Sequence, residues 1–301
     1  AARERVPKVP NSPSSFSTYV RPIKAIKASD PYTLVMTTEK PHPLLPNDLA
    51  TVYMVSKKAA SGASTEDFNS GKAAIGTGPY KLVRFAKGDR LELARNDAWW
   101  GGKTPWEKAT LRIVTNDPAR VAALLSGDIQ ALENAPTADM ARLKTDKNLA
   151  LARVGSNRLI YLHLDSSRDV SPFVTDKQGK PLAKNPLKDP RVRKAISLAL
   201  NRDAIVSRVM EGEAIAAGQP LPDGYPGTSK NLKPDKFDTA QAKKLLAEAG
   251  YPDGFGVTIH APNNRYVNDE QIAQAVAQML TRAGIATKVE AMPSAVYFTR
   301  A

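Results

Sequence analysis

The residues best suited to chemistry are few in this sequence and lie far apart. The three histidines, His42, His163 and His260, form no HExxH motif and no close pair with the spacing of metal ligands. The chain of 301 residues has no cysteine, which excludes disulfides, thiolate zinc sites and thiol catalysis. We therefore expect no metal site and no cofactor.

Motifs for covalent or nucleotide chemistry are also missing. There is no GxSxG nucleophile elbow and no Walker A loop, and Gly76-Thr-Gly78 lacks the third glycine of a dinucleotide loop. The carboxylate pairs Glu66-Asp67 and Asp269-Glu270 fall on polar surfaces or helix starts, where helix capping accounts for them. We expect no catalytic residues, so the sequence does not predict an enzyme.

The charge balance is strongly basic but dispersed. The formal net charge is +13, yet no basic run exceeds two adjacent residues and aromatics make up 6% of the chain. A nucleic-acid interface more often concentrates its cations beside stacking aromatics. We interpret the excess as a solvated surface and expect no nucleic-acid partner. No apolar stretch has the length of a membrane span, and no apolar segment of the kind found in a signal peptide follows the basic start.

Hydrophobic periodicity and turn residues predict a mixture of strands and helices in about two domains. The predicted strands cover residues 32–38, 80–85, 91–94, 110–115, 129–132, 149–154, 159–164, 257–260 and 285–291. Predicted helices begin at the N-caps Asp117, Asp189, Asp203, Asp238 and either Asn268 or Asp269, with further helices at 137–144 and from Pro293. Residues 1–29 are expected to be an irregular lead-in, and residues 166–185 a long polar loop.

An ordered series of motifs carries a resemblance to a known family. The series is Gly76-Thr-Gly-Pro-Tyr80, then Gly88-Asp-Arg-Leu-Glu-Leu-Ala-Arg-Asn96-Asp-Ala-Trp-Trp100, Leu124-Leu-Ser-Gly-Asp-Ile129, Asp189-Pro-Arg-Val-Arg-Lys-Ala-Ile196 and Ala242-Lys-Lys-Leu-Leu-Ala-Glu-Ala-Gly-Tyr-Pro-Asp-Gly-Phe255. In order and spacing it resembles the family 5 solute-binding proteins of ABC importers, the peptide, nickel and oligopeptide group. Gly76 and Gly78 are expected to supply unusual backbone angles, and Trp99 and Trp100 to pack as core and strand-end plugs.

The resemblance implies an α/β, periplasmic-binding-protein-like fold of two lobes, of the class C type, here as a partial chain. Residues 1–77 would be the end of an extra domain, 78–163 part of the first lobe and 164–301 part of the second lobe. The two lobes would be joined by crossing segments, one of them at residues 161–165. The family extends before residue 1 and after residue 301, so we expect a fragment of a longer protein.

The resemblance also points to eight ligand-binding residues. The crossing strand of the family faces the cleft, and Tyr161 and His163 alternate onto one face of it, opposite Leu162 and Leu164. The other candidates lie in loops: Glu133, Asn134, Asn263, Asn264, Arg265 and Asn268. The last four of them stand between a strand and a helix N-terminus, an edge that ligands favour in α/β sheets. For each residue the alternative is a plain structural role in a loop, a cap or a satisfied polar contact.

By this resemblance the protein is a receptor that binds a peptide between closing lobes and delivers it to the permease subunits of an ABC importer. It would act as a monomer in the periplasm, or lipid-anchored on the extracellular face. Within this class the alternative ligands are nickel, an opine or an oligosaccharide. From other classes, a hydrolase with an unrecognised carboxylate site and a basic RNA-binding fragment remain alternatives.

Overall fold

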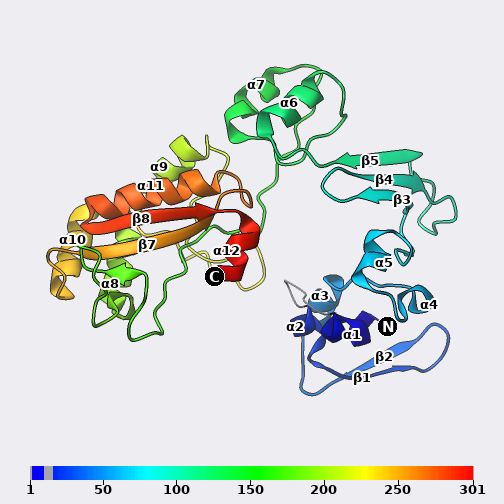
Figure 1. Cartoon of the computed structure of the whole chain (residues 1–301), viewed down its shortest axis with the longest axis horizontal. Helices are drawn as coiled ribbons and strands as arrows, with labels where there is room; N and C mark the ends of the chain where they lie inside the picture. The colour runs from blue at the N-terminus through cyan, green and yellow to red at the C-terminus, as the bar shows by residue number, and fades with distance from the viewer. Residues whose placement is uncertain (1, 10–15, 301) are drawn as a thin grey trace. The chain divides into compact units, whose positions relative to one another are not determined.

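The chain folds as two compact units, each of which combines helices with a β-sheet. Figure 1 shows a computed structural model, which describes residues 2–9 and 16–300. The units comprise residues 1–120 and 121–301. The division at residue 120 falls inside the segment that the resemblance assigns to the first lobe. The α/β class is confirmed, while the domain boundaries after residues 77 and 163 stay predictions.

The first unit opens with short helices and a hairpin. Strands β1 (Ile23–Ala28) and β2 (Leu34–Thr38) pair antiparallel. β1 was missed by the sequence prediction because Ile23 is its one buried residue and the five that follow are exposed, so no alternation marks the strand. Short helical segments precede and follow the hairpin in the chain: α1 (Ala2–Arg5), η1 (Val6–Lys8), α2 (Ser17–Val20), α3 (Leu45–Ala50), α4 (Lys57–Ala60) and α5 (Thr65–Asn69). The part of the expected lead-in at residues 10–15 lies outside the described residues.

Helix α5 confirms the capping role expected for the first carboxylate pair. The Ser64 hydroxyl accepts a hydrogen bond from the Asp67 backbone, and the Asp67 carboxylate accepts one from the Ser64 backbone. The bond from the Ser64 backbone, followed by those from the Ser64 hydroxyl and from Lys72 to the same carboxylate, lowers the pKa of Asp67 to about 2. The carboxylate is therefore engaged in capping and is not poised for proton transfer.

A second antiparallel sheet completes the first unit. It consists of β3 (Tyr80–Ala86), β4 (Arg90–Arg95) and β5 (Lys108–Arg112), with β4 in the centre. Gly88 adopts a φ of 81° in the turn between β3 and β4, which only glycine enters without strain. The register shifts between Leu82 and Arg84, as in a β-bulge. The strands predicted at 80–85, 91–94 and 110–115 are confirmed within a few residues.

Two expectations at the ends of this sheet are wrong. Trp100 is 86% exposed and is no core plug, whereas Trp99 is half-buried over Gly101, where an added Cβ would lie 2.5 Å from the indole. Gly76 and Gly78 have ordinary backbone angles and open space around them. The turn is held instead by Asn96, whose side-chain amide donates to the Gly78 carbonyl at 3.0 Å.

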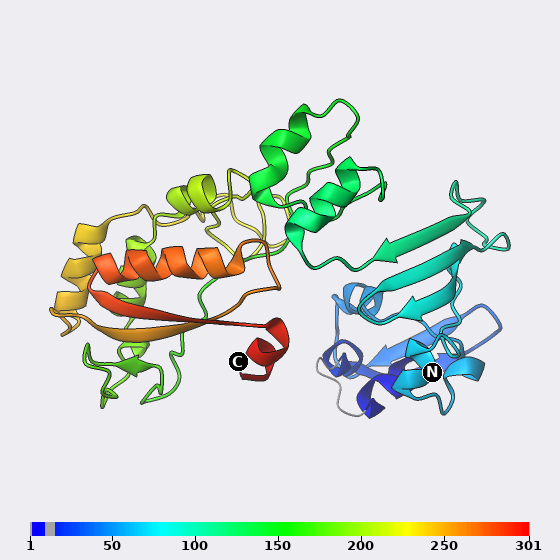
Figure 2. The same cartoon turned by 45° about the horizontal axis from the view of Figure 1, so that its top comes forward.

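The second unit is built on a three-stranded sheet of mixed direction. β7 (Phe255–Pro262) and β8 (Ile285–Met292) run parallel, and the short β6 (Val174–Thr175) pairs antiparallel with β7. Helix α11 (Asp269–Arg282) connects β7 to β8 and lies along both strands (Figure 2). This arrangement brings the carboxyl ends of β7 and β8 to one edge of the sheet.

One hydrophobic core holds the second unit together. Helices α8 (Pro190–Ala199) and α10 (Thr239–Glu248) pack against each other and against the sheet. Large side chains of this core include Val192, Leu246, Phe255 and Ile285, none of them more than 2% exposed. The remaining segments are α6 (Asp117–Leu125), η2 (Thr137–Asp139), α7 (Met140–Thr145), η3 (Pro186–Lys188), α9 (Arg202–Ala204), the π-helical turn η4 (Ile205–Val209) and α12 (Ser294–Arg300).

The predicted N-caps are right for the two longer helices that precede β7. Asp189 accepts from the Arg191 backbone and Asp238 from the Gln241 backbone, each at 2.8 Å. Asp117 and Asp203 are the wrong caps. Asn116 accepts from the Ala119 backbone at 2.9 Å, and Asn201 accepts from the Ala204 backbone at 2.9 Å, so the helices begin one or two residues earlier.

Three predicted strands, at residues 129–132, 149–154 and 159–164, are not strands in the structure. A strand exists only where its backbone groups pair with a neighbour. Among the described residues these segments have no partner strand. In residues 159–164 the alternation of polar and apolar residues corresponds to burial without pairing, since Leu162 and Leu164 pack against the core. In residues 149–154 it corresponds to neither, since Val154 is 91% exposed.

Candidate functional site

The segment that precedes the long polar loop presents two aromatic side chains to solvent. Leu162 and Leu164 pack against the hydrophobic core, whereas Tyr161, which is 68% exposed, and His163 point away from it. The rings of Tyr161 and His163 lie 6.3 Å apart between centroids. The predicted alternation is thus confirmed, although this segment is extended chain without strand pairing.

The loop between β7 and α11 is shaped by one buried carboxylate. Asp269 is 7% exposed and accepts hydrogen bonds from the backbones of Arg265 at 2.9 Å and Tyr266 at 3.0 Å. Asn268, the other predicted cap, makes no capping bond with its side chain. Asp269 therefore holds the loop against the start of α11. It also fixes the backbone of Arg265 and Tyr266, and with it the direction of their side chains.

Two arginines meet on the ring of Tyr266. The Arg265 guanidinium carbon lies 5.0 Å from the ring centroid and that of Arg158 lies 5.5 Å from it. Arg265 comes from the loop after β7, and Arg158 from the extended segment that leads to Tyr161. Such stacking orients a guanidinium while its N–H donors stay available, because the contact uses the plane of the group.

A third tyrosine reaches the same place from α12. Burial raises the pKa of the Tyr297 hydroxyl, and the nearby hydroxyls of Tyr266 and Tyr161 raise it further. We call Arg158, Tyr161, His163, Arg265, Tyr266 and Tyr297 the tyrosine–arginine cluster. It lies beyond the carboxyl ends of β7 and β8, where ligands bind in many α/β sheets.

The three asparagines predicted beside Arg265 hold the loops in place. The side-chain oxygen of Asn264 accepts from the Ser294 backbone at 2.8 Å, at the start of α12, and the Asn263 backbone donates to the Met292 carbonyl. Asn268 has a left-handed φ of 52°, and its amide donates to the Thr137 hydroxyl at 2.9 Å and the Val209 carbonyl at 2.7 Å. Asn268 thus joins three segments of the second unit.

Glu133 and Asn134 lie in the loop before η2, and both side chains are exposed. Asn134 has a left-handed φ of 58°. Their loop is tied to the start of α11 through Thr137, which receives the hydrogen bond from Asn268. Of the eight predicted residues, the structure brings Tyr161, His163 and Arg265 into the cluster. Sequence reasoning missed Arg158, Tyr266 and Tyr297.

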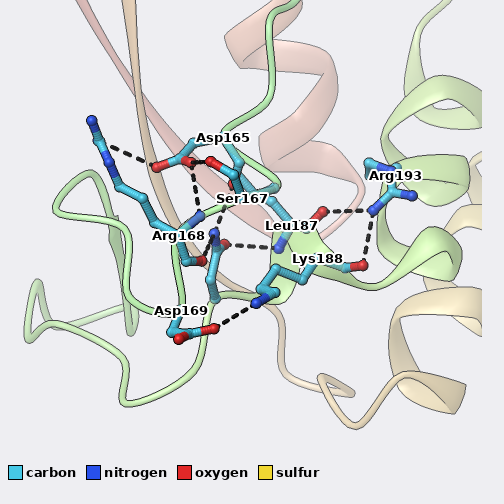
Figure 3. A network of polar contacts seen from close by, with 8 residues as sticks. Asp165, Ser167, Arg168, Asp169, Leu187, Lys188 and Arg193 are labelled. Atoms are coloured by element: carbon cyan, nitrogen blue, oxygen red, sulfur yellow. Dashed lines mark hydrogen bonds and ion pairs between the residues drawn. The ribbon is translucent and has the colours of Figure 1, made fainter.

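The long polar loop is clamped at its base by a buried asparagine. Asn185, 6% exposed, donates to the carbonyls of Asp165 at 2.7 Å and Arg168 at 3.0 Å, and accepts from the Leu187 backbone at 3.0 Å. Figure 3 shows this network, in which Lys188 also pairs with Asp169. The two ends of the loop are therefore held side by side.

A groove of about 970 Å³ opens beside this loop, lined among others by Lys188, Arg191 and Tyr251. Two of its three cations are engaged, because Lys188 pairs with Asp169 while Arg191 bonds to Asp189 and to the Glu248 carbonyl. Among the described residues the exposed Lys184, which also lines the groove, has no ion pair within 4.0 Å. The tyrosine–arginine cluster offers two stacked guanidiniums against this single lysine, so we assign the candidate ligand-binding site to the cluster.

Glu213 fastens the segment around residue 150 to the chain after η4. Its carboxylate, 13% exposed, pairs with Lys144 at 2.8 Å and Arg153 at 2.6 Å. The hydrogen bond from Lys144, with further help from Arg153, holds the pKa of Glu213 below its ordinary value of 4.5. The pairing therefore stabilises the folded state above that value, and the stabilisation is lost as the pH falls through the lower folded-state pKa.

We expect Glu213→Gln to lower the free energy of unfolding by about 1–2 kcal/mol at neutral pH, since both cations are about half exposed. The difference from the unmodified protein should shrink as the pH falls below 4.5 and through the lowered folded-state pKa, because the carboxylate then protonates. Urea unfolding at several pH values measures it. The control is Glu211→Gln, an exposed neighbour that should change little. An effect of Glu213→Gln that is equal at all pH values would contradict the ion-pair explanation.

Comparison with known proteins decides the family. The family model for bacterial extracellular solute-binding proteins, family 5, matches residues 3–301. The chain belongs to this family. Family 5 consists of solute-binding receptors that act outside the cytoplasm, and it is not a family of enzymes. Among the described residues no helix is both long and apolar enough to cross a membrane, and no three potential side-chain metal ligands come together.

Individual family 5 relatives agree with this assignment. The glutathione-binding protein GsiB of Pectobacterium atrosepticum is 30% identical over 273 residues, which are 90% of this chain and 49% of that protein. The structure of DppA from Helicobacter pylori in complex with the peptide STSA is 27% identical in sequence to this chain. The match covers 94% of this chain and 52% of the DppA chain, with a TM-score of 0.71. NikZ from Campylobacter jejuni, in complex with Ni(L-His), shares the fold, with 24% identity and a TM-score of 0.76. That match covers 97% of this chain and 57% of the NikZ chain. The chain spans about half the length of these relatives, and the fold is that of the family 5 binding proteins.

Proposed function

We propose that the protein containing this chain is the receptor of an ABC importer and binds a short peptide for delivery to the permease. The relative named for glutathione binding and the structure of DppA in complex with the peptide STSA support a peptide ligand. The protein would act as a monomer, in the periplasm or anchored by lipid on the extracellular face. It would perform no reaction on its ligand and bind no nucleic acid.

The tyrosine–arginine cluster is the observation that carries this proposal. Arg158 and Arg265 stack on the ring of Tyr266, which leaves the N–H donors of both guanidiniums available, and the exposed rings of Tyr161 and His163 lie 6.3 Å apart between centroids. Arginine suits the planar carboxylate of a peptide because it donates two parallel hydrogen bonds. The cluster would therefore bind the carboxylate end of the peptide, with the tyrosine rings against its backbone.

Calorimetric titration tests the proposal. The protein in its native length is titrated with glutathione, with dipeptides and with the same dipeptides carrying an amidated carboxyl end. Binding of the free acids, weakened about tenfold by amidation, is the expected result. Native mass spectrometry of material purified without refolding would identify any ligand that co-purifies. Tight binding of nickel–histidine, an opine or an oligosaccharide instead of peptides would replace the proposed ligand class.

We expect Arg158→Gln and Arg265→Gln each to weaken binding of a free-acid peptide about tenfold, because each removes a charged donor to the carboxylate. The amidated peptide should bind these variants and the unmodified protein about equally. Arg282→Gln, an exposed cation at the end of α11, is the matched control and should leave both affinities unchanged. If the variants weakened the amidated peptide to the same extent as the free acid, the arginines would not contact the carboxylate.

A further inference from the structure

One face of the sheet in the first unit carries five cations among small and polar residues. The register places Lys81 and Lys108 on either side of Ala94, Arg84 opposite Glu92, and Arg90 opposite Arg112. Directly paired residues share a face, as do alternate residues of one strand. The face therefore carries Lys81, Arg84, Arg90, Lys108 and Arg112 around a single carboxylate, Glu92. We call it the cationic sheet face.

The pairing of Arg90 with Arg112 works against the stability of the sheet. Like charges directly opposite each other on antiparallel strands are destabilising. Arg90 is relieved in part by Asp89, its neighbour in the turn, at 2.9 Å. Among the described residues Arg112 has no ion pair within 4.0 Å, and neither has Arg84. The repulsion between Arg90 and Arg112 lowers the stability of the sheet and is only partly offset. An uncompensated cost of this kind favours a functional role for the charges, such as binding an anionic partner.

The arrangement suits a broad anionic surface and not a small anion. Lys81, Arg84, Lys108 and Arg112 are exposed, and the side chain of Arg90 is 42% exposed. From strand spacing, the charges spread over about 10 Å across the strands and about 13 Å along them. Donors that bind a single phosphate or carboxylate converge on one pocket, whereas these cations are spread over the face.

We propose that the cationic sheet face binds the anionic headgroups of the lipid bilayer. Family 5 members work outside the cytoplasm, and a receptor that serves a membrane permease meets phospholipid surfaces there. A sheet face can lay several cations on such a surface at once. The contact would be weak and dependent on ionic strength, because each cation contributes modestly and salt screens exposed charges. The proposal does not depend on which ligand the tyrosine–arginine cluster binds.

Vesicle sedimentation tests this contact directly. The protein in its native length is spun with vesicles of equal parts phosphatidylglycerol and phosphatidylcholine, and with vesicles of phosphatidylcholine alone, at low and high salt. We expect binding to the anionic vesicles at low salt and its loss at high salt. The double variant Lys81→Gln with Lys108→Gln should bind about 25-fold more weakly, at about fivefold per cation.

The matched control removes the same charge elsewhere in the first unit. Lys57→Gln with Lys58→Gln changes two exposed lysines of α4 and leaves the net charge identical to that of the test variant. This control should bind anionic vesicles as the unmodified protein does. Equal losses in the two double variants would mean that net charge alone drives binding, and would overturn the assignment to the sheet face.

Arg112→Glu separates the proposed role from a structural one. It replaces a like-charge pair with an opposite-charge pair across from Arg90, so the melting temperature of the first unit should rise. The affinity of the same variant for anionic vesicles should fall by more than about fivefold, because the substitution reverses a charge and does not merely remove one. A variant that is more stable and binds less supports the proposal. No binding of the unmodified protein to anionic vesicles, or binding to an acidic protein such as the permease without binding to lipid, refutes it.

Discussion

Replacing Gly254 by alanine is expected to destabilise the second unit by at least about 3 kcal/mol. Gly254 has a φ of 75°, and a Cβ there would lie 1.9 Å from the Gly284 carbonyl oxygen. The two glycines precede β7 and β8, whose first residues, Phe255 and Ile285, pair directly. An alanine would combine a left-handed backbone with a clash against main chain, and neither partner can move without opening the sheet.

Gly250→Ala is the matched control for this effect. Gly250 has a φ of 92°, but the space where its Cβ would stand is empty. Only the backbone penalty applies there, about 1–2 kcal/mol. Urea unfolding gives the free energies, and hydrogen exchange of amides in β7 and β8 locates the loss. Equal costs for the two substitutions would show that the close approach of Gly254 to Gly284 contributes nothing.

Replacing Asn185 by alanine is expected to lower the free energy of unfolding by about 2–4 kcal/mol. The substitution removes three hydrogen bonds at once, and it leaves the Asp165 and Arg168 carbonyls and the Leu187 amide without those partners. Burial makes the loss expensive, because water reaches these groups poorly. Proteolysis within residues 166–184 should accelerate as the base of the loop opens.

Asn231→Ala serves as the control for Asn185. Asn231 is exposed, and a change there should stay within about 0.5 kcal/mol. Urea unfolding and the rate of tryptic cleavage after Lys177 are measured on both variants. A stability of Asn185→Ala close to that of the unmodified protein would show that the loop is held by its other contacts, such as the pair between Lys188 and Asp169.

Much of the second unit was predictable because its elements are amphipathic and carry their own caps. The helices at Asp189 and Asp238 begin as predicted, and β7 and β8 lie where β-branched and apolar residues alternate with polar ones. The family was also recognisable, since its motifs fall in order along the chain. Local patterns carry this information because burial and capping act over a few residues.

Strand pairing was not predictable in the same way. Residues 159–164 alternate like a strand, and Leu162 and Leu164 are indeed turned to the core, but a ladder also needs a neighbour that local sequence does not encode. The reverse error occurred at β1, which pairs with β2 although only Ile23 is buried.

Only half of the residues of the tyrosine–arginine cluster were predicted from the sequence, for a related reason. Arg265 was noticed because it stands between a strand and a helix, and Tyr266 follows it without any distinguishing pattern. Arg158 and Tyr297 are more than a hundred residues apart in sequence, and each looks like an ordinary surface residue. Only the fold shows that Arg158 stacks on Tyr266 and that the Tyr297 hydroxyl is close to those of Tyr266 and Tyr161.

The clamp at Asn185 and the pairing of β6 with β7 fix the base of the predicted long polar loop to the second unit, so that only the turn beyond β6 is a closed excursion. Its ends are fixed together, so the loop can grow at its tip with only a small entropic cost, which rises with the logarithm of its length. The turn at residues 177–180 is exposed, and Gly179 there already adopts a left-handed φ of 89°. A peptide tag or a fluorescent domain grafted at this turn would therefore be carried without disturbing the core. The same turn is a place where the chain can change in length while β6 keeps its pairing with β7.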